Sequence, residues 1–517
     1  MTKILLRGGT VFDGVTSQRR KVSVLVGNGF IEKVGVNIST SEANHVLVID
    51  GAWLTPGFID PHSHADASLL SGANMDLRAF SGVTTEIVGQ DGLGLSHSKG
   101  RGAEQMIEIL TPIAGDMQHL LFSDVADYLG ALDSGAFARA GTLSPHGTIR
   151  SEVIGRELNA ASERQLGEMA DAFARDMSAG ALGLSTGLSY PPAIASDTDE
   201  LVGMLTAVGP STLYVTHLRS YGKEFGQSVD EALEIAERSR CRLHLSHFHV
   251  SGPGRRGQAR TFLDILEKLP SLPTLDSYPY LHACTFLTSL LPPRFQSFSH
   301  NELRGIITQN IAAIATEVKA AGPEGTIAVG WAPLIFAGLA GSHKGWNGRS
   351  VEEICLESGL SPEKVILLAV SSEDYSPMVL VPQGIQENIV DVALSNLQVV
   401  GSDGIFGAGA PHPRISGSFF RFLKLVKDEV IPISLESAVA KMTSKTAKIF
   451  NLQLGAIAEG YPADLLVIDP EKISKGSDVL TTQPEALIHV LINGQFTLRD
   501  SRWLGIKLDN LALRGGR

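Results

Sequence analysis

The sequence predicts an α/β protein: a (β/α)8 barrel of the TIM type, with a small β-sandwich domain built from both chain termini. Three observations predict it. The middle of the chain alternates short apolar runs with helix-like stretches, a pattern typical of βα units and a parallel sheet. Eight of these apolar runs can be counted, which is the number that such a barrel needs. The two ends of the chain instead carry only short β-rich runs broken by Gly and Asn.

The β-rich ends set the expected domain limits. "KVSVLVGNGFIEKVG" and "HVLVIDG" near the start resemble in texture "ADLLVIDP" and "ALIHVLINGQFTLRDS" near the end. Short runs of this kind, bounded by turn residues, are typical of antiparallel strands. We therefore expect residues 1–54 and 451–517 to form the two parts of the sandwich, and residues 55–450 to form the barrel.

The expected barrel strands are spaced so that helices fit between most of them. One helix is predicted over 162–180, closed by Gly180, and another over 228–239, with Ser228 as N-cap and Glu231 completing a capping box. The predicted strands are residues 57–64, 83–91, 140–147, 181–188, 212–217, 241–247, 273–280 and 397–403.

The gap between the seventh and eighth predicted strands, residues 281–396, is too long for a single crossover. It should hold an inserted subdomain, at about 284–396, which could serve as a lid or as an assembly contact. A homo-oligomer is therefore left open.

Composition excludes several classes of protein. Hydrophobic residues make up 43% and charged residues 19%, which suits a globular chain with a sizeable core. A formal net charge of −12 argues against nucleic-acid and anionic-membrane partners, because both need clustered Lys and Arg. No apolar run approaches the roughly 18 residues of a spanning helix. Cys241, Cys284 and Cys355 are few and far apart, which fits a reduced, cytoplasmic protein without a disulfide framework.

The stretch "LTPGFIDPHSHADASLL" places His62 and His64 two residues apart just after an apolar run. If the strand continues that far, both imidazoles point to the same side, where they could bind a metal. With 15 histidines in the chain, about 0.4 His-x-His pairs arise by chance, so the pair alone is weak.

Other polar residues follow the apolar runs in the same way. Asp91 ends the second predicted strand, His217 the fifth, His247 the sixth and Asp403 the eighth. Asp91 and Asp403 each precede Gly, so either one alone could be only a turn residue. In a barrel of this type all these strand ends meet at one rim, where the chemistry sits. Six residues with metal-ligand chemistry at one rim predict a metal centre.

Several longer segments make the chain similar to the amidohydrolase superfamily, and within it to the N-acyl-D-amino-acid deacylase (D-aminoacylase) family. They include "PGFIDPHSHAD", "GVTTEIVGQDG", "GALGLSTGLSYPP", "DSYPY", "HPRISGSFFRFL" and "GAIAEGYPADLLVIDP". The resemblance runs nearly the whole chain. It implies a metal-dependent barrel with a β-sandwich from both termini, and hydrolysis of an N-acyl amino acid, of the D configuration, as the activity.

The resemblance also implies residue roles. His217 and His247 would bind the tighter zinc ion, and His62 and His64 a second, weaker site, so that one or two divalent ions are held per chain, with manganese or cobalt as substitutes. Asp403 would be the general base. The expected substrate-binding residues are Tyr190, Arg219, His249, Tyr278 and Arg414. His146 also lies in a family-like segment, without an assigned role.

Three positions depart from the family pattern. Asp91 stands where the family usually has a Cys zinc ligand. A carboxylate is a harder ligand than a thiolate and can bridge two metals, so we hypothesise that Asp91 bridges. His249 stands where the family often has Lys, and Tyr221 stands where it has an acid. Both changes fall near the expected substrate site, so they leave the substrate open.

Two other readings remain at this stage. One is hydrolysis of a cyclic or aryl amide, as in hydantoinases. Cyclic-amide enzymes of this superfamily generally have a carboxylated Lys on the fourth strand, and "ALGLSTGL" here has none. The other is a non-catalytic barrel used as a scaffold, which would predict lost metal ligands.

Overall fold

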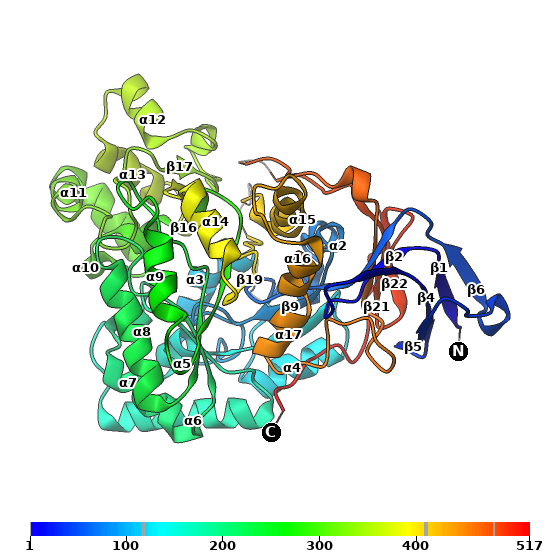
Figure 1. Ribbon diagram of the computed structural model, residues 1–517. Helices are drawn as coiled ribbons and strands as arrows, with labels where there is room; N and C mark the ends of the chain where they lie inside the picture. Colours follow the sequence, from blue (N-terminus) through cyan, green and yellow to red (C-terminus); the bar gives the residue numbers. More distant parts are fainter. Residues whose placement is uncertain (1, 116, 118, 408–411, 479–480, 517) are drawn as a thin grey trace.

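A computed structural model describes residues 2–115, 117, 119–407, 412–478 and 481–516. The chain forms two unlike regions (Figure 1). The larger one has parallel strands surrounded by helices, and the smaller one consists of β-sheets on the side where the N-terminus lies. The pattern of apolar runs in the sequence predicts this division into a βα middle and β-rich ends.

The parallel strands of the larger region form two sheets, in the orders β10-β9-β8 and β11-β12-β13-β14-β15-β19. A single residue, Leu143, separates β10 from β11, and Ser63 makes a parallel bridge to Gly404 just beyond β19. The strands are β8 (Phe58–Asp60), β9 (Val83–Val88), β10 (Arg139–Thr142), β11 (Ser144–Pro145), β12 (Leu184–Gly187), β13 (Leu213–His217), β14 (Arg242–Leu245), β15 (Thr274–Ser277) and β19 (Gln398–Val400).

These strands are shorter than the sequence predicts, mostly at their carboxyl ends. The first predicted strand covers 57–64, but β8 ends at Asp60. His62 and His64 therefore lie in the following loop, and the expectation that an extended strand aligns their side chains is wrong. Because polar residues and glycines begin where each apolar run ends, the chain leaves the sheet there and forms loops at the rim.

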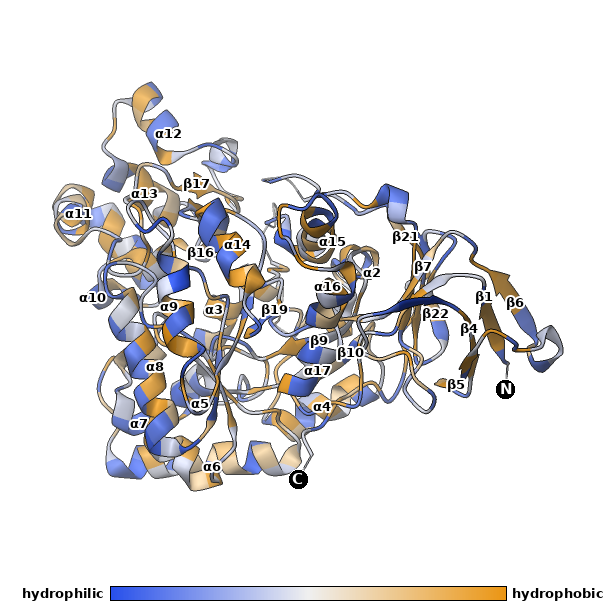
Figure 2. Cartoon of the chain, in the orientation of Figure 1, coloured by the Kyte–Doolittle hydropathy of each residue, from blue (hydrophilic) through white to orange (hydrophobic). Residues whose placement is uncertain are grey.

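The helices that surround these strands mix hydrophobic and hydrophilic residues, as Figure 2 shows for α6, α7 and α8. Helices that cover a core on one side have this pattern. They are α1 (Ser68–Ser71), α2 (Met75–Ser81), α3 (Ala103–Ala114), α4 (Val125–Asp133), α5 (His146–Val153), α6 (Glu163–Ala179), α7 (Thr198–Val208), α8 (Phe225–Ser239), α9 (Gln258–Leu266), α14 (Gln386–Leu394), α15 (Arg414–Lys427), α16 (Leu435–Met442) and α17 (Ser444–Ile449).

Helix α6 confirms its predicted ends. Ser162 caps it in a capping box with Gln165, and Gly180 ends it in a left-handed conformation. The predicted cap of α8 is wrong. That helix begins at Phe225, and the Ser228 hydroxyl donates to the carbonyl of Glu224 inside the first turn. Phe225 is fully buried, and its packing favours the earlier start.

The segment between β15 and β19 folds around an apolar cluster of its own, which includes Leu303, Trp331 and Val365. Three antiparallel strands pair in the order β16-β18-β17 beside four helices. The elements are β16 (His282–Phe286), α10 (Pro293–Gln296), α11 (His300–Ala321), β17 (Ile335–Phe336), α12 (Val351–Ser358), α13 (Pro362–Ser371) and β18 (Met378–Pro382).

Both ends of the chain meet in one seven-stranded sheet, β23-β22-β21-β20-β7-β2-β3, beside a four-stranded sheet, β5-β4-β1-β6. Leu6 and Val24 of the smaller sheet share an apolar cluster with Leu54 and Leu465 of the larger one. The strands are β1 (Ile4–Arg7), β2 (Thr10–Phe12), β3 (Arg19–Lys21), β4 (Ser23–Gly27), β5 (Phe30–Gly35), β6 (His45–Val48), β7 (Trp53–Pro56), β20 (Leu465–Ile468), β21 (Leu487–Ile492), β22 (Gln495–Arg499) and β23 (Arg502–Trp503).

Among the residues that the structure describes, no helix has the length and apolar character needed to cross a membrane.

Candidate metal centre and active site

The six predicted rim residues converge on one place, although only one of them lies inside a strand. His217 is the last residue of β13, and the others lie in loops that follow β8, β9, β14 and β19. Two groups of side chains bring their ligand atoms within 4.8 Å of one another: His62, His64, Asp91 and Asp403 in one, and Asp91, His217 and His247 in the other. All six are buried.

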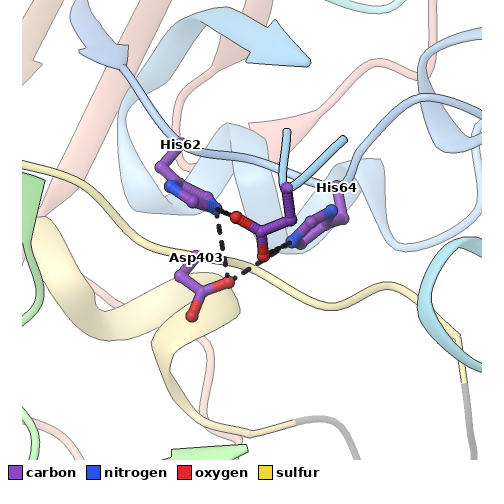
Figure 3. A group of neighbouring side chains, drawn as sticks. His62, His64 and Asp403 are labelled. Atoms are coloured by element: carbon purple, nitrogen blue, oxygen red, sulfur yellow. Dashed lines mark ion pairs between the residues drawn. The ribbon is translucent and has the colours of Figure 1, made fainter. Parts of the chain in front are cut away.

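In the first group, two imidazoles and a carboxylate face one another (Figure 3). Nε2 of His64 lies 3.3 Å from Oδ1 of Asp403, and Nε2 of His62 lies 3.7 Å from the same oxygen. Backbone contacts hold this arrangement: the Asp403 amide donates to the carbonyl of His62 at 2.8 Å, and the His64 amide donates to the carbonyl of Gly404. The loops after β8 and β19 are thus fixed to each other at the site.

Asp91 lies between the two pairs of histidines. Its Oδ1 is 3.4 Å from Nε2 of His62 and 3.6 Å from Nε2 of His247. Its Oδ2 is 3.7 Å from Nε2 of His64 and 3.6 Å from Nδ1 of His217. Each carboxylate oxygen therefore faces one histidine of each pair, which is the placement that a bridging ligand needs.

The backbone at three of these positions lies in the left-handed region: φ is 55° at Asp91, 50° at Asp403 and 32° at His247. Such conformations cost about 1–3 kcal/mol for residues other than glycine and cluster at functional sites. Gly187 permits the turn at Asp91, because a Cβ atom there would lie 2.2 Å from the carbonyl oxygen of Asp91.

The second pair of histidines is held by neighbouring side chains. Nδ1 of His217 and Nε2 of His247 lie 2.8 Å apart, so both nitrogens point at the same space. The other ring nitrogen of His217, Nε2, lies 2.8 Å from the hydroxyl of Ser189. A partner on the second nitrogen fixes the ring of a metal-binding histidine. Tyr221 packs edge-on against His217, with ring centroids 4.9 Å apart.

Asp276 contacts three histidines at or beside the site. It is not among the site residues predicted from the sequence. Its Oδ1 accepts from the amide of His247 at 3.0 Å, and its Oδ2 lies 3.0 Å from Nε2 of His244 and 3.5 Å from Nδ1 of His62. The signal was present, since Asp276 stands inside the buried strand "PTLDSYPY", where an unpaired carboxylate is costly.

Two buried ligand atoms lack hydrogen-bond partners. Nε2 of His62 and Oδ1 of Asp91 are inaccessible and, although they lie 3.4 Å apart, neither makes a hydrogen bond within the part of the chain that the structure describes. Burying polar atoms without a partner costs free energy, so these atoms are suited to binding a cation. Imidazole nitrogens and carboxylate oxygens together fit zinc and related divalent ions. The residues present therefore fit a metal centre.

A cavity opens beside these ligands, and its empty space of about 820 Å³ includes open solvent at the mouth. Four of the predicted substrate-binding residues line it: Tyr190, His249, Tyr278 and Arg414. Tyr221 also lines it, so all three positions that depart from the family pattern, Asp91, His249 and Tyr221, line the cavity. Burial lowers the pKa of His249 to about 3, and the neighbouring His247 adds to this effect, so His249 is neutral.

Arg219 and His146 have other surroundings. The Arg219 guanidinium pairs with Glu231 at 2.8 Å and donates to the carbonyls of Ile194 and Ser196, and Arg219 is not among the residues that line the cavity. A substrate contact for Arg219 finds no support in this arrangement. His146 lies 2.8 Å from Glu200, fully buried, in the position of a structural histidine.

Arg414 and Asp403 link the cavity to the ligand set. Nη1 of Arg414 lies 2.9 Å from Oδ2 of Asp403, and its guanidinium lies 4.9 Å from the centre of the Tyr278 ring. Burial raises the pKa of Asp403, but Arg414 and the imidazole of His64 lower it by more, so that it falls below its ordinary value. Asp403 is therefore ionised at neutral pH.

Comparison with known proteins agrees with this geometry. Residues 49–282 and 387–497 match models of the amidohydrolase family. An N-acyl-D-aspartate deacylase from Alcaligenes xylosoxydans xylosoxydans is 30% identical over 479 residues, which cover 91% of this chain and 86% of that protein. A D-aminoacylase from the same organism is 29% identical over 515 residues, covering 97% and 96%.

A solved D-aminoacylase structure, described for the functional role of its binuclear metal centre, is 25% identical and covers 100% of both chains with a TM-score of 0.81. The matches extend over the parallel strands, the segment between β15 and β19, and the terminal sheets. The chain thus belongs to the amidohydrolase family and, within it, to the N-acyl-D-amino-acid deacylases.

Proposed function

We propose that this protein is a metal-dependent amidohydrolase that cleaves the amide bond of an N-acyl amino acid of the D configuration. The observation that carries the proposal is the convergence of four histidines and two aspartates beside a cavity large enough for a small substrate. The similar proteins, an N-acyl-D-aspartate deacylase and a D-aminoacylase, support the choice of substrate class.

The proposed metal centre holds one or two divalent ions, with zinc favoured by the donor set and manganese or cobalt as substitutes. His217 and His247 would hold one ion, His62 and His64 the other, and Asp91 would bridge them. When bound, such an ion lowers the pKa of a water molecule to about 7 and polarises an amide carbonyl. The binuclear centre named for the similar D-aminoacylase supports this proposal.

Asp403 has the central role in the proposed reaction. As the general base, its carboxylate accepts a proton from the attacking water and passes it to the leaving nitrogen. Its lowered pKa keeps it ionised and able to accept. The backbone contact between Asp403 and His62 keeps the carboxylate beside the ligand set.

Substrate binding is assigned to the residues of the cavity wall beside Asp403. Nε of Arg414 is buried without a hydrogen-bond partner, as is Nε2 of His249. Arginine matches a carboxylate geometrically, so Arg414 would hold the carboxylate of the amino acid, with His249 and Tyr278 beside it. The Tyr190 hydroxyl makes a long contact, of 3.4 Å, with the hydroxyl of Thr285. It would donate to the carbonyl oxygen of the substrate amide.

We also propose that the parallel strands form a closed barrel and that the terminal sheets form a β-sandwich. The two parallel sheets follow the strand order of a (β/α)8 barrel, and the Ser63–Gly404 bridge supports its closure. The shared apolar cluster supports a β-sandwich of the two terminal sheets. The proposed divisions are those of the sequence, 1–54, 55–450 and 451–517, with the insertion at about 284–396.

A substrate screen tests the function. Protein purified without chelator, and then supplied with zinc or manganese, should hydrolyse at least one member of a panel of N-acyl-D-amino acids. N-acyl-L-amino acids and cyclic and aryl amides would be assayed beside them. Hydrolysis of hydantoins or aryl amides alone would overturn the proposal.

A further inference from the structure

The charge of the substrate cavity carries an inference about the substrate, which rests on the proposed function. Among the described residues that line the cavity, Arg414 is the only Lys or Arg. The acidic residues of the wall are Asp91 and Asp403. The cavity therefore offers one permanently cationic side chain outside the proposed metal centre.

The guanidinium of Arg414 already contacts other residues of the protein. Arg414 pairs with Asp403 through Nη1, stacks on Tyr278 and lies 3.5 Å from the carbonyl of Cys284 through Nη2, which leaves Nε as the nitrogen without a contact to receive one carboxylate. Under the proposed function this is the carboxylate that every N-acyl amino acid carries. A second carboxylate, on an acidic substrate side chain, would find no arginine or lysine of its own.

The remaining wall has many apolar side chains beside uncharged polar ones such as Thr285, Thr326 and Gln383, and the insertion between β15 and β19 supplies much of it. Ala283 and Phe286 of β16, Met378 and Val381 of β18, and Ile327 all face the cavity. Leu93, Ile113 and Ile405 continue this surface on the side of the parallel strands. Apolar walls of this kind bind apolar groups through the removal of surface from water.

We propose that the site selects N-acyl amino acids with an uncharged, apolar side chain and discriminates against acidic side chains. In this respect the protein departs from the N-acyl-D-aspartate deacylase to which it is 30% identical. A carboxylate buried among apolar groups without a partner carries a desolvation penalty of several kcal/mol. We expect a preference of about 100-fold or more in kcat/KM.

Pairs of substrates of matched size test this preference. N-acetyl-D-leucine would be compared with N-acetyl-D-aspartate, and N-acetyl-D-methionine with N-acetyl-D-glutamate, in the zinc-loaded and manganese-loaded full-length protein. Higher kcat/KM for leucine and methionine is the expected result. Equal or higher values for the acidic substrates would overturn this inference and leave the proposed function standing. No hydrolysis of any N-acyl amino acid, L or D, would overturn both.

A binding measurement separates recognition from turnover. With the Asp403→Asn variant, calorimetry should give a dissociation constant for N-acetyl-D-leucine at least tenfold below that for N-acetyl-D-aspartate. Comparable constants for the two would contradict the inference, whatever the activity of the parent enzyme.

An added cation should shift the preference. Thr326 lines the cavity, is partly exposed and lies in a loop of the insertion, so Thr326→Arg introduces a guanidinium at the wall. Thr316→Arg makes the same change of charge on the exposed face of α11, away from the cavity. We expect Thr326→Arg to raise the aspartate-to-leucine ratio of kcat/KM about tenfold, and Thr316→Arg to leave it unchanged. If circular dichroism shows Thr326→Arg to be folded and its ratio equals that of the control, the apolar wall does not set the preference.

Discussion

The carboxylate of Asp403 is shared between Arg414 and His64. Its Oδ2 lies 2.9 Å from Nη1 of Arg414, and its Oδ1 lies 3.3 Å from Nε2 of His64. The same side chain thus touches the wall that we assign to the substrate and the histidines that we assign to the metal. A residue in this position can act on the substrate without being a principal metal ligand.

Replacement of Asp403 by Asn should abolish catalysis and spare metal binding. Asn keeps the size of the side chain but cannot accept the proton, and the loss of a general base costs about 10²–10⁴-fold in rate. We expect kcat to fall by about that factor while the metal content per chain stays at the parent value. Metal analysis and steady-state kinetics on one preparation check both. Retained turnover would refute the assignment of the base.

Arg414 should discriminate between a carboxylate and an uncharged amide on the substrate. Arg414→Gln removes the charge while keeping some hydrogen-bonding capacity. A hydrogen bond to a charged group contributes about 1.5–3 kcal/mol, which corresponds to roughly 10- to 150-fold. The parent enzyme should therefore prefer an N-acyl amino acid over its C-terminal carboxamide, and the variant should lose that preference. An unchanged ratio of kcat/KM values would exclude Arg414 as the carboxylate anchor.

Asp91 should determine how many metal ions the protein holds. Because its two oxygens face both pairs of histidines, Asp91→Ala should weaken both positions and lower the metal content by at least one ion per chain. Asp171→Ala, at an exposed position of α6, is the matched control. Metal content is measured after purification without chelator. One ion per chain in the parent, unchanged in Asp91→Ala, would contradict the bridging role.

The rim residues could be predicted from the sequence, because the topology of parallel strands places all their carboxyl ends together. His217 and Asp403 were predicted in this way, and the structure brings them to the same site. The local conformation could not be predicted. His62 and His64 meet because backbone hydrogen bonds from Asp403 and to Gly404 fix their loop, and not because a strand continues through them.

Residues whose role depends on tertiary contacts also could not be predicted from the sequence. Asp276 stands in the middle of an apolar run, and only the fold brings it to His244 and His62. For Arg219 the expected substrate contact stays a prediction. Its segment resembles a family motif, but α8, which begins six residues further on, supplies Glu231, which pairs with its guanidinium, and Arg219 is not among the described residues that line the cavity. The position of a residue in a motif predicts which part of the fold it lies in. The group with which its side chain pairs determines the direction in which that side chain points.

His97 should make the stability of the protein depend on pH in a range where the rim carboxylates do not titrate. It is buried in the loop after β9, with Nδ1 2.9 Å from Glu152 and Nε2 2.9 Å from Asp176. Burial lowers the pKa of His97, but the two carboxylates raise it by more, to about 9. Because the pKa in the folded state exceeds the unfolded value near 6.5, the stabilisation is complete below pH 6.5 and is lost as the pH rises to about 9.

The expected contribution of His97 is on the order of 3 kcal/mol, from the difference between its pKa of about 9 in the folded protein and the unfolded value near 6.5. His97→Gln keeps a hydrogen-bonding side chain but cannot carry the charge. Thermal unfolding of the parent and of this variant, both in the same metal-loaded state, would be followed between pH 6 and 9.5. The difference in Tm should be largest at pH 6 and shrink steadily towards pH 9. Parallel curves across this range would show that His97 is not charged in the folded protein, because a neutral imidazole between Glu152 and Asp176 would give no slope in this window.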